Sequence, residues 1–316
     1  MMINNKLLII HQGALGDFIL IFPAIVRLHN YYGSIDVLCQ SGLGKLAKSL
    51  GLVENWYPLE AANVATLFTD NVDPKIKRLL TPYVKILLFS LSSELEQSIC
   101  QITSKPGCRI APKPPPHLRL HLTEFVLENL IICKLIKKTN GIIEGIPPPI
   151  RRSRPKYSDK ILLHPGAGSI RKRWSISNFL EVEAMLEADG LKPEFILGPA
   201  EEDLVDTLPR TNRTVHILTD LTELAALLKS AGGYIGNDSG ASHLAAFLGV
   251  PTVVIFGPTD PERWKPVGRA VEIVRPELEC RPCFETEAAN CEDPCCLEKT
   301  TPEEVIQAFY RAYSVH

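Results

Sequence analysis

The stretch Gly232–Gly268 reads GGYIGNDSGASHLAAFLGVPTVVIFGPTDPERWKPVG, and it decides the fold of the chain. Its first residues have the composition of a short buried strand. The glycine-bounded polar loop Gly236–Gly240 follows, and then a run of helix-forming residues, Ala241–Leu248, which a Gly-Val-Pro sequence ends. The β-branched run Thr252–Phe256 predicts a parallel strand buried on both faces. The order strand, loop, helix, strand is typical of an open α/β sheet.

The loop in this unit is rich in groups that bind ligands. It lies at the carboxyl end of a strand and at the start of a helix, where open α/β sheets bind ligands and free N–H groups favour phosphate. Asn, Asp and Ser also cap helices well, and a histidine can serve only to satisfy a carbonyl, so a purely structural interpretation stays open. The residues concerned are Gly236, Asn237, Asp238, Ser239, Gly240 and His243.

The amino-terminal segment repeats the order of strand, glycine-containing loop and helix. We expect a strand at Lys6–His11 and a helix at Phe18–Tyr31. The intervening G-A-L-G-D is not the G-x-G-x-x-G pattern of dinucleotide-binding loops, so it does not predict NAD binding. Gly13 and Gly16 allow the backbone to approach a ligand. Asp17, at the helix start, is either a helix cap or a functional carboxylate.

A third strand–loop–helix unit opens the second half of the chain. Ile161–Leu163 predicts a strand, and small residues followed by a basic cluster predict a diphosphate-binding loop. A surface loop with solvated Arg and Lys is the alternative. The residues of this unit that we single out are His164, Gly166, Gly168, Ser169, Lys172 and Trp174, with Gly198 at the end of the next predicted strand.

Four strings in these segments resemble signatures of glycosyltransferase family 9, the heptosyltransferases of lipopolysaccharide core synthesis. They are G-A-L-G-D-x-I-L-x-x-P-A at 13–24, H-P-G-A-G-S-x-x-K-x-W at 164–174, G-N-D-S-G-x-x-H-L-A-A at 236–246 and G-x-P-T-V-x-I-F-G-P-T-D-P at 249–261. The resemblance implies the α/β GT-B fold, with two doubly wound Rossmann-like domains that face each other across a cleft.

The resemblance also implies an activity. It is inverting, metal-independent transfer of a heptose from ADP-heptose to a lipopolysaccharide core acceptor, with Asp17 as general base and Lys172 meeting the charge of the leaving group. The chain contains no D-x-D sequence, which agrees with a reaction that needs no metal. Gly13 and Gly16 would line the acceptor side. The donor-binding residues would be His164, Gly166, Gly168, Ser169, Lys172, Trp174, Gly198, Asn237, Asp238, Ser239, Gly240 and His243.

Other functions remain open at this point. A sugar-nucleotide epimerase shares the two-domain architecture and needs no acceptor, and a non-catalytic nucleotide-sugar-binding protein would bind ADP without chemistry. The segment 86–97, ILLFSLSSELEQ, departs from the Arg-containing acceptor segment that is common in the family. The acceptor is therefore not identified by the sequence.

The domain boundary is predicted in Pro147–Lys156, because its prolines and charges are typical of a stiff, exposed linker. Residues 1–152 would form the acceptor-side domain. Residues 153–316 would form the domain that binds the nucleotide sugar, with a Cys-rich segment at 280–296 and a helix at 302–316.

Composition and charge limit the classes of protein to which the chain can belong. Hydrophobic residues make up 45% and charged residues 22%, as in an ordinary globular protein. Residues 1–160 hold 20 Lys and Arg and 12 Asp and Glu (+8), and the remainder 14 and 24 (−10), which sums to −2. The basic half indicates either contact with an anionic lipid surface or scattered surface lysines. No signal peptide or membrane span is expected, nor a nucleic-acid partner, so we expect a cytoplasmic protein with peripheral contact at the inner face of the membrane.

The nine cysteines fall into two groups. Four are scattered, as expected of buried thiols in a reducing compartment: Cys39, Cys100, Cys108 and Cys133. Five are clustered: Cys280, Cys283, Cys291, Cys295 and Cys296. The cluster is compatible with a structural zinc held by Cys280, Cys283, Cys291 and Cys295, with disulfides, or with free thiols.

Overall fold

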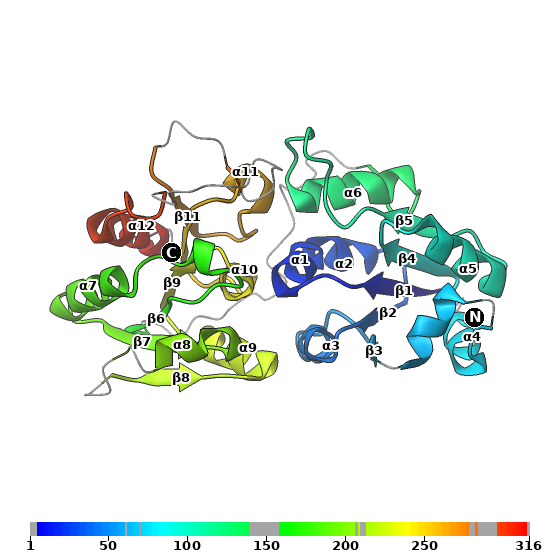
Figure 1. The fold of residues 1–316 in the computed structure, drawn as a ribbon, viewed down its shortest axis with the longest axis horizontal. Helices are drawn as coiled ribbons and strands as arrows, with labels where there is room; N and C mark the ends of the chain where they lie inside the picture. Colours follow the sequence, from blue (N-terminus) through cyan, green and yellow to red (C-terminus); the bar gives the residue numbers. More distant parts are fainter. Residues whose placement is uncertain are drawn as a thin grey trace. The chain divides into compact units, whose positions relative to one another are not determined.

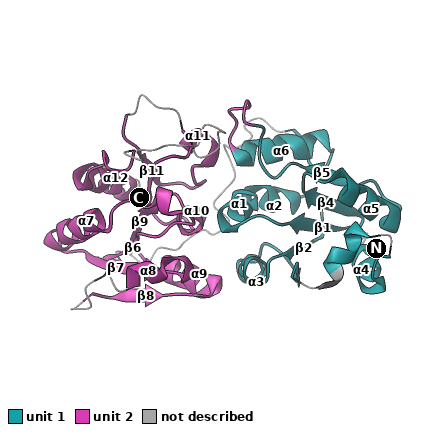
Figure 2. Cartoon of the chain, viewed as in Figure 1, with its two compact units in different colours: residues 1–115, 122–146 teal, residues 116–121, 147–316 magenta. Residues whose placement is uncertain are grey.

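The computed structural model of the chain divides into two compact units. Unit 1 comprises residues 1–115 and 122–146, and unit 2 comprises residues 116–121 and 147–316 (Figure 2). The structure describes residues 5–60, 62–69, 71–138, 158–205, 208, 213–277, 282–283 and 296–314. The boundary predicted between residues 152 and 153 lies outside the described residues and stays a prediction.

The described residues of unit 1 form five parallel strands in the order β3-β2-β1-β4-β5 (Figure 1). The strands are β1 Lys6–His11, β2 Ser34–Cys39, β3 Asn55–Pro58, β4 Lys85–Phe89 and β5 Cys108–Ile110. The helices are α1 Leu15–Leu20, α2 Phe22–Leu28, α3 Ser41–Ser49, α4 Pro74–Leu80, α5 Ser93–Thr103 and α6 Leu122–Ile132, with a 3-10 helix at Ala62–Phe68. Strand residues Leu8 and Ile10 pack on the side of α4 and α5.

The first helix differs from the prediction of a single helix at Phe18–Tyr31. Helix α1 begins at Leu15, and the helical run is interrupted at Ile21 before α2 begins at Phe22. Pro23 explains the interruption, because it has no N–H to donate to the preceding turn. As a result Asp17 lies inside the first turn of α1, and the N-cap position belongs to Ala14.

In unit 2, the part of the chain that the structure describes forms six parallel strands in the order β11-β10-β9-β6-β7-β8. They are β6 Lys160–His164, β7 Lys192–Leu197, β8 Val215–Ile217, β9 Gly233–Asn237, β10 Thr252–Ile255 and β11 Val271–Val274. The helices are α7 Ile176–Ala188, α8 Glu202–Val205, α9 Leu221–Ser230, α10 Gly240–Phe247, α11 Pro261–Trp264 and α12 Pro302–Ser314, with 3-10 helices at Ile170–Lys172 and Pro199–Glu201. The predicted α/β class with parallel sheets is confirmed in both units.

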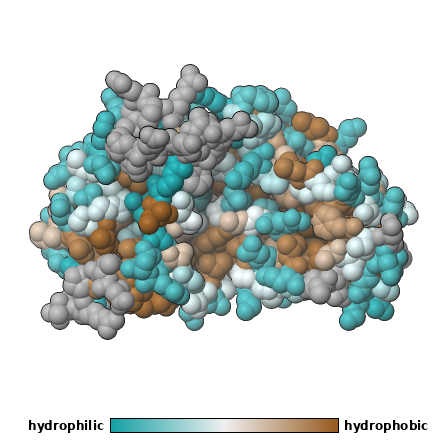
Figure 3. Space-filling model, in the orientation of Figure 1, coloured by the Kyte–Doolittle hydropathy of each residue, from teal (hydrophilic) through white to brown (hydrophobic). Residues whose placement is uncertain are grey.

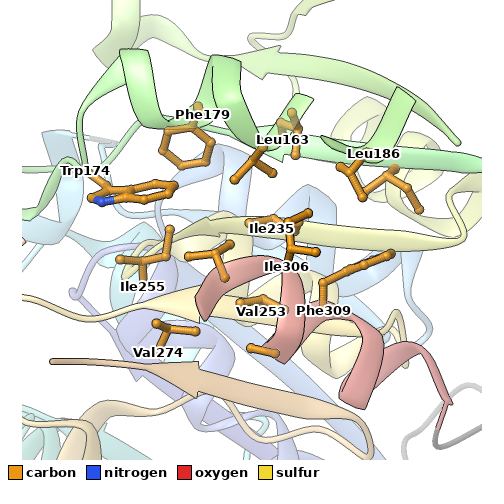
Figure 4. Close-up of a cluster of buried hydrophobic side chains, with 14 of the residues drawn as sticks. Leu163, Trp174, Phe179, Leu186, Ile235, Val253, Ile255, Val274, Ile306 and Phe309 are labelled. Carbon is orange, nitrogen blue, oxygen red and sulfur yellow. The ribbon is translucent and has the colours of Figure 1, made fainter. Parts of the chain in front are cut away.

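The core of unit 2 shows how one face of its sheet is covered. Trp174, just before α7, and Phe179 on α7 lie on one side of the cluster in Figure 4, and Ile306 and Phe309 enter it from α12. A Cβ on Gly233 would lie 2.6 Å from a ring carbon of Phe309, so α12 can pack this closely only because β9 begins with a glycine. The strands contribute Leu163, Ile235, Val253, Ile255 and Val274.

A buried carboxylate fixes the edge strand of the unit 1 sheet. Asp36 on β2 is 2% exposed and accepts the backbone N–H of Asn55 at 2.9 Å and the Tyr83 hydroxyl at 2.7 Å. Burial, together with hydrogen bonds to Tyr57 and Asp36, raises the pKa of Tyr83. The paired Asp36 therefore anchors β3, whose sequence has no strong strand pattern of its own.

Two of the four scattered cysteines are not free thiols, contrary to the prediction. Cys108 on β5 and Cys133 after α6 form a disulfide whose Cα atoms lie 6.2 Å apart. Cys39 and Cys100 are free. The sequence could not pair the two because the contact arises from the packing of α6, which brings residues 25 positions apart together.

The surface mixes polar and apolar residues on the face drawn in Figure 3. Single apolar side chains are highly exposed, such as Leu91 at 76%, Ile132 at 74% and Ile170 at 74%. Isolated exposed apolar side chains are normal on globular proteins. Among the described residues, no helix is both long enough and apolar enough to cross a membrane.

Candidate functional site

The predicted phosphate loops meet at one point of the unit 2 sheet. Strands β6 and β9 are neighbours, with His164 in register with Gly236. On one side of this pair the sheet continues with β7 and β8, and on the other with β10 and β11. The strand order therefore reverses between β6 and β9, and loops at such a switch point diverge and leave room for a ligand.

Asn237 holds the two loops together. It is fully buried, and its side-chain amide donates to the Pro165 carbonyl at 2.7 Å and accepts the Trp174 backbone N–H at 3.1 Å. A buried amide that is satisfied in this way fixes the backbone on either side of it. Asn237 thus positions the loop after β6 from the end of β9.

Lys172 and Asp238 form an ion pair at the switch point. Lys172 Nζ lies 2.8 Å from Asp238 Oδ2, and the Thr259 hydroxyl donates to the same oxygen at 2.7 Å. Asp238 is 5% exposed and Thr259 2%, whereas the Lys172 side chain is 19% exposed. The carboxylate is therefore enclosed, while the Lys172 side chain is partly exposed.

His243, on α10, lies behind this ion pair. Its Nε2 is 3.9 Å from Asp238 Oδ1, and its Nδ1 is buried without a hydrogen-bond partner among the described residues. Burial lowers the pKa of His243 to about 4, which the nearby Asp238 charge opposes, while His121 and Lys172 lower the pKa further. His243 is consequently uncharged at neutral pH.

The amino terminus of α10 is not capped by its own side chain. Ser239 occupies the N-cap position but makes no side-chain capping bond. Its hydroxyl instead faces His164 Nδ1 at 3.4 Å and the Ser242 hydroxyl at 3.3 Å. The alternative in which Ser239 serves only to cap the helix therefore does not hold for its side chain. Gly240 is the first residue of α10.

The glycines of this region serve different purposes. A Cβ on Gly166 would lie 2.2 Å from the Glu201 carboxyl group, and one on Gly236 would lie 2.5 Å from the Tyr234 hydroxyl. A Cβ on Gly168 would meet nothing within 4 Å. Packing within the protein therefore explains Gly166 and Gly236, whereas Gly168 borders open space beside Ser169.

Glu201 is a functional candidate that the sequence did not single out. Its side chain accepts the Gly198 N–H at 2.7 Å and lies 3.8 Å from His164 Nε2. Burial would raise the pKa of Glu201, but the His164 ring, the Gly198 amide and the charge of Arg173 together lower it. The carboxylate thus stays ionised although it is 3% exposed. No motif marked it, since acidic residues after a strand are common.

Trp174 is part of the core. It is 2% exposed, its indole N–H donates to the Thr300 carbonyl at 3.1 Å, and its ring packs edge-on against Phe179. The predicted donor contact by Trp174 is therefore not supported by its position. Its role in the structure is to anchor the loop that carries Ser169 and Lys172.

In unit 1, His11, Gly13 and Asp17 are packed together. The Gly13 N–H donates to His11 Nδ1 at 3.2 Å. A Cβ on Gly13 would lie 2.7 Å from His11 Cε1 and 3.2 Å from Asp17 Oδ2, so a larger residue would displace one of them. Asp17 is partly exposed, and Gly16 precedes it as the second residue of α1.

Two buried histidines predict how stability depends on pH. Burial lowers the pKa of both His11 and His243 to about 4, below the value of 6.5 in an unfolded chain. Above pH 6.5 their contribution is complete, and it is lost as the pH falls towards 4, because the unfolded chain then binds protons that the folded chain does not. We expect a lower urea midpoint at pH 5 than at pH 7.5.

The matched variants for this measurement are His11→Asn and the exposed His117→Asn. His11→Asn should flatten the pH dependence, and His117→Asn should leave it as in the wild type. Equal slopes for the wild type and His11→Asn would show that His11 does not titrate as its burial requires.

Of the four predicted zinc ligands, the structure describes Cys283. Cys280, Cys291 and Cys295 lie outside the described residues. Cys283 is described, and its sulfur lies 3.4 Å from an Arg171 guanidinium nitrogen. Within the described part of the chain, no group of His, Cys, Asp and Glu is arranged to hold a metal ion. The structural zinc stays a prediction.

Comparison with known proteins shows which family the second half of the chain resembles. The sequence model of glycosyltransferase family 9 (heptosyltransferase) matches residues 148–292. Lipopolysaccharide heptosyltransferase 3 of Escherichia coli K12 is 34% identical over 113 residues, 34% of this chain and 33% of that protein. Lipooligosaccharide heptosyltransferase 2 of Campylobacter jejuni is 32% identical over 158 residues, 47% of this chain and 49% of that protein. The predicted resemblance to glycosyltransferase family 9 is thus confirmed over residues 148–292.

The curated relatives match part of the chain in sequence, whereas the solved structures match nearly all of it in fold. The chain spans about a third to a half of the length of these curated relatives. The E. coli heptosyltransferase WaaC with ADP superposes with a TM-score of 0.69 at 17% identity, over 97% of this chain and 99% of that one. At this identity the likeness shows the fold alone, which is the GT-B heptosyltransferase fold.

Proposed function

We propose that the protein is an inverting heptosyltransferase that transfers a heptose from ADP-heptose to a lipopolysaccharide core acceptor. The observation that carries this proposal is the Lys172 side chain, which is 19% exposed and lies at the switch point of unit 2 beside the amino terminus of α10. A cation and free helix N–H groups at one strand edge suit a diphosphate. The match of residues 148–292 to the family model, and the ADP in the WaaC structure of similar fold, support the choice of nucleotide.

The donor would bind to unit 2 through two kinds of contact. The diphosphate would take its charge-assisted hydrogen bonds from Lys172 and its backbone contacts from the loop of Gly168 and Ser169 and from the start of α10, at Ser239 and Gly240. Open space at Gly168 leaves room for such a close approach. His164, Gly166, Gly198, Asn237 and His243 would shape the pocket from behind.

The chemistry requires a base as well as a stabilised leaving group. The acceptor hydroxyl oxygen would attack the anomeric carbon, the bond from that carbon to the diphosphate oxygen would break, and ADP would leave. Asp17 would accept the hydroxyl proton, and Lys172 would offset the charge that develops on the diphosphate. Inversion follows from a single displacement. Lys172 takes the part that a bound metal plays elsewhere, so no metal is required for this step.

The partners and location follow from the same proposal. The acceptor would be a glycolipid, whose headgroup would be presented at the inner membrane surface to a cytoplasmic enzyme that is peripheral to the membrane. The positive balance of residues 1–160, +8 from 20 Lys and Arg against 12 Asp and Glu, supports attraction to an anionic surface.

Thermal melting with different nucleotides tests the donor assignment. Because a ligand that binds only the native state raises the melting temperature, ADP in saturating excess should raise it more than UDP or GDP at equal concentration. A larger shift with UDP would overturn the choice of ADP-heptose.

A coupled assay separates the two rival functions. A transferase releases ADP from ADP-heptose only when an acceptor is added. An epimerase would convert the donor without acceptor, and a binding protein would shift its melting temperature with ADP but release none from the donor. Either of these outcomes would overturn the proposal.

A further inference from the structure

We infer that Asp238 acts as a built-in competitor for Lys172, and that it weakens the binding of a diphosphate at the switch point of unit 2. The inference rests on the proposed function, in which Lys172 binds the diphosphate of the donor. It concerns a residue that the sequence places among the donor contacts, and it assigns to that residue the opposite effect on nucleotide affinity.

The first observation is the ion pair itself. Lys172 Nζ lies 2.8 Å from Asp238 Oδ2, so the charge on the lysine is balanced by a group of the protein itself. A diphosphate that approaches Lys172 must share the ammonium group with this carboxylate or displace it. An anion next to the site also repels a second anion, and it does so more strongly in surroundings of low dielectric than in water.

The second observation is that Asp238 cannot turn away from the lysine. The Thr259 hydroxyl donates to the same oxygen, Oδ2, at 2.7 Å, and Asp238 is 5% exposed. His243 faces the other oxygen at 3.9 Å, with an uncharged ring at neutral pH, so it adds no second cation to balance the carboxylate. The carboxylate is therefore held in position and relies on Lys172 for its compensating charge.

A consequence for turnover follows. A nucleoside diphosphate product carries more charge on its terminal phosphate than the sugar-linked donor does. Competition from Asp238 therefore weakens the binding of the product more than the binding of the donor. This difference favours release of the product. Release of the product limits turnover in many enzymes.

The direction of one affinity change tests the inference. Asp238→Asn keeps the shape and can still accept the Thr259 hydrogen bond, but it removes the negative charge. Titration calorimetry with ADP and with inorganic pyrophosphate should show both ligands bound about fivefold or more tightly by Asp238→Asn than by the wild type, the lower end of typical coupling between two linked events. If Asp238 only supported the structure, or made a favourable contact with the nucleotide, its replacement would weaken the binding of both ligands.

A double-mutant cycle with Lys172→Ala shows whether the effect passes through the lysine. In the Lys172→Ala background, the gain from Asp238→Asn should shrink, since no ammonium group is left to compete for. The same gain in both backgrounds would overturn the competition and leave only general repulsion.

Two further variants cover the case in which Asp238→Asn does not fold, as judged by its melting. Thr259→Val removes the second donor to Asp238, so the carboxylate oxygen then accepts from Lys172 alone and holds it more strongly. ADP binding by this variant should therefore weaken. Thr259→Ser keeps the hydroxyl donor and should bind ADP as the wild type does. Equal affinity for Thr259→Val and Thr259→Ser would overturn the inference.

The outcomes separate this inference from the proposed function. If the wild type binds neither ADP nor pyrophosphate, both fail. If the wild type binds ADP but Asp238→Asn binds it equally or less tightly, the inference alone fails and the proposed function stands.

Discussion

Asp17→Asn should transfer sugar at least about a hundredfold more slowly than the wild type, since general-base catalysis contributes about 10²–10⁴-fold. ADP affinity should be unchanged, because Asp17 lies in unit 1 and the phosphate loops lie in unit 2. The amide keeps the size of the carboxyl group beside Gly13, so the fold should survive. Single-turnover rates with ADP-heptose and acceptor, together with calorimetry on ADP, measure the two quantities.

Asp73→Asn is the matched control for this variant. Asp73 is also an acidic residue at the start of a helix in unit 1, where its carboxylate caps α4 by accepting the Lys75 N–H at 2.6 Å. Its replacement should leave transfer unchanged. Wild-type turnover by Asp17→Asn would reduce Asp17 to a residue that stabilises the helix dipole. Loss of ADP binding would contradict the division of roles between the units.

Lys172→Ala should lower the rate of transfer by about 10²–10³, the usual cost of removing one group that stabilises developing charge. Unlike Asp17→Asn, it should also weaken ADP binding by about tenfold or more, because a hydrogen bond to a charged group is lost. Steady-state kinetics and calorimetry on the same preparation measure the two effects.

Lys192→Ala is the control for the loss of a lysine. Lys192 is paired with Asp159 at 2.6 Å, but its side chain is 72% exposed and lies at the amino end of β7. Exposed ion pairs contribute little, so this variant should behave as the wild type. If Lys172→Ala and Lys192→Ala had equal kinetics, Lys172 would not take part in the reaction.

Sequence reasoning was most successful where local pattern and long motifs agree. The segment from Gly232 onward predicts β9, α10 and β10 with errors of one or two residues at their ends, because a buried strand, a glycine-bounded loop and a helix stop each have a local cause. The resemblance to glycosyltransferase family 9 was predicted from the same residues and is confirmed over residues 148–292. The site roles of these residues remain predictions.

The parts that sequence reasoning missed depend on contacts between distant residues. β3 is held by the buried Asp36, whose partners lie 19 and 47 residues away. The pairing of Cys108 with Cys133 depends on the packing of α6. Glu201 joins the site because it lies 3.8 Å from His164 on β6, and Thr259 joins it by donating to Asp238, 21 residues away. No local spacing could have indicated these contacts.

The packing of α12 has a consequence for synthesis on the ribosome. Its Ile306 and Phe309 complete a core whose earliest strand, β6, begins at Lys160. Until these residues emerge, the nascent sheet exposes the apolar face formed by Leu163, Ile235 and Val253. Long-range closure of this kind delays folding and leaves intermediates prone to aggregation. The half of the chain that carries Lys172 therefore cannot complete its core until the last helix is made, although its strands and loops are made much earlier.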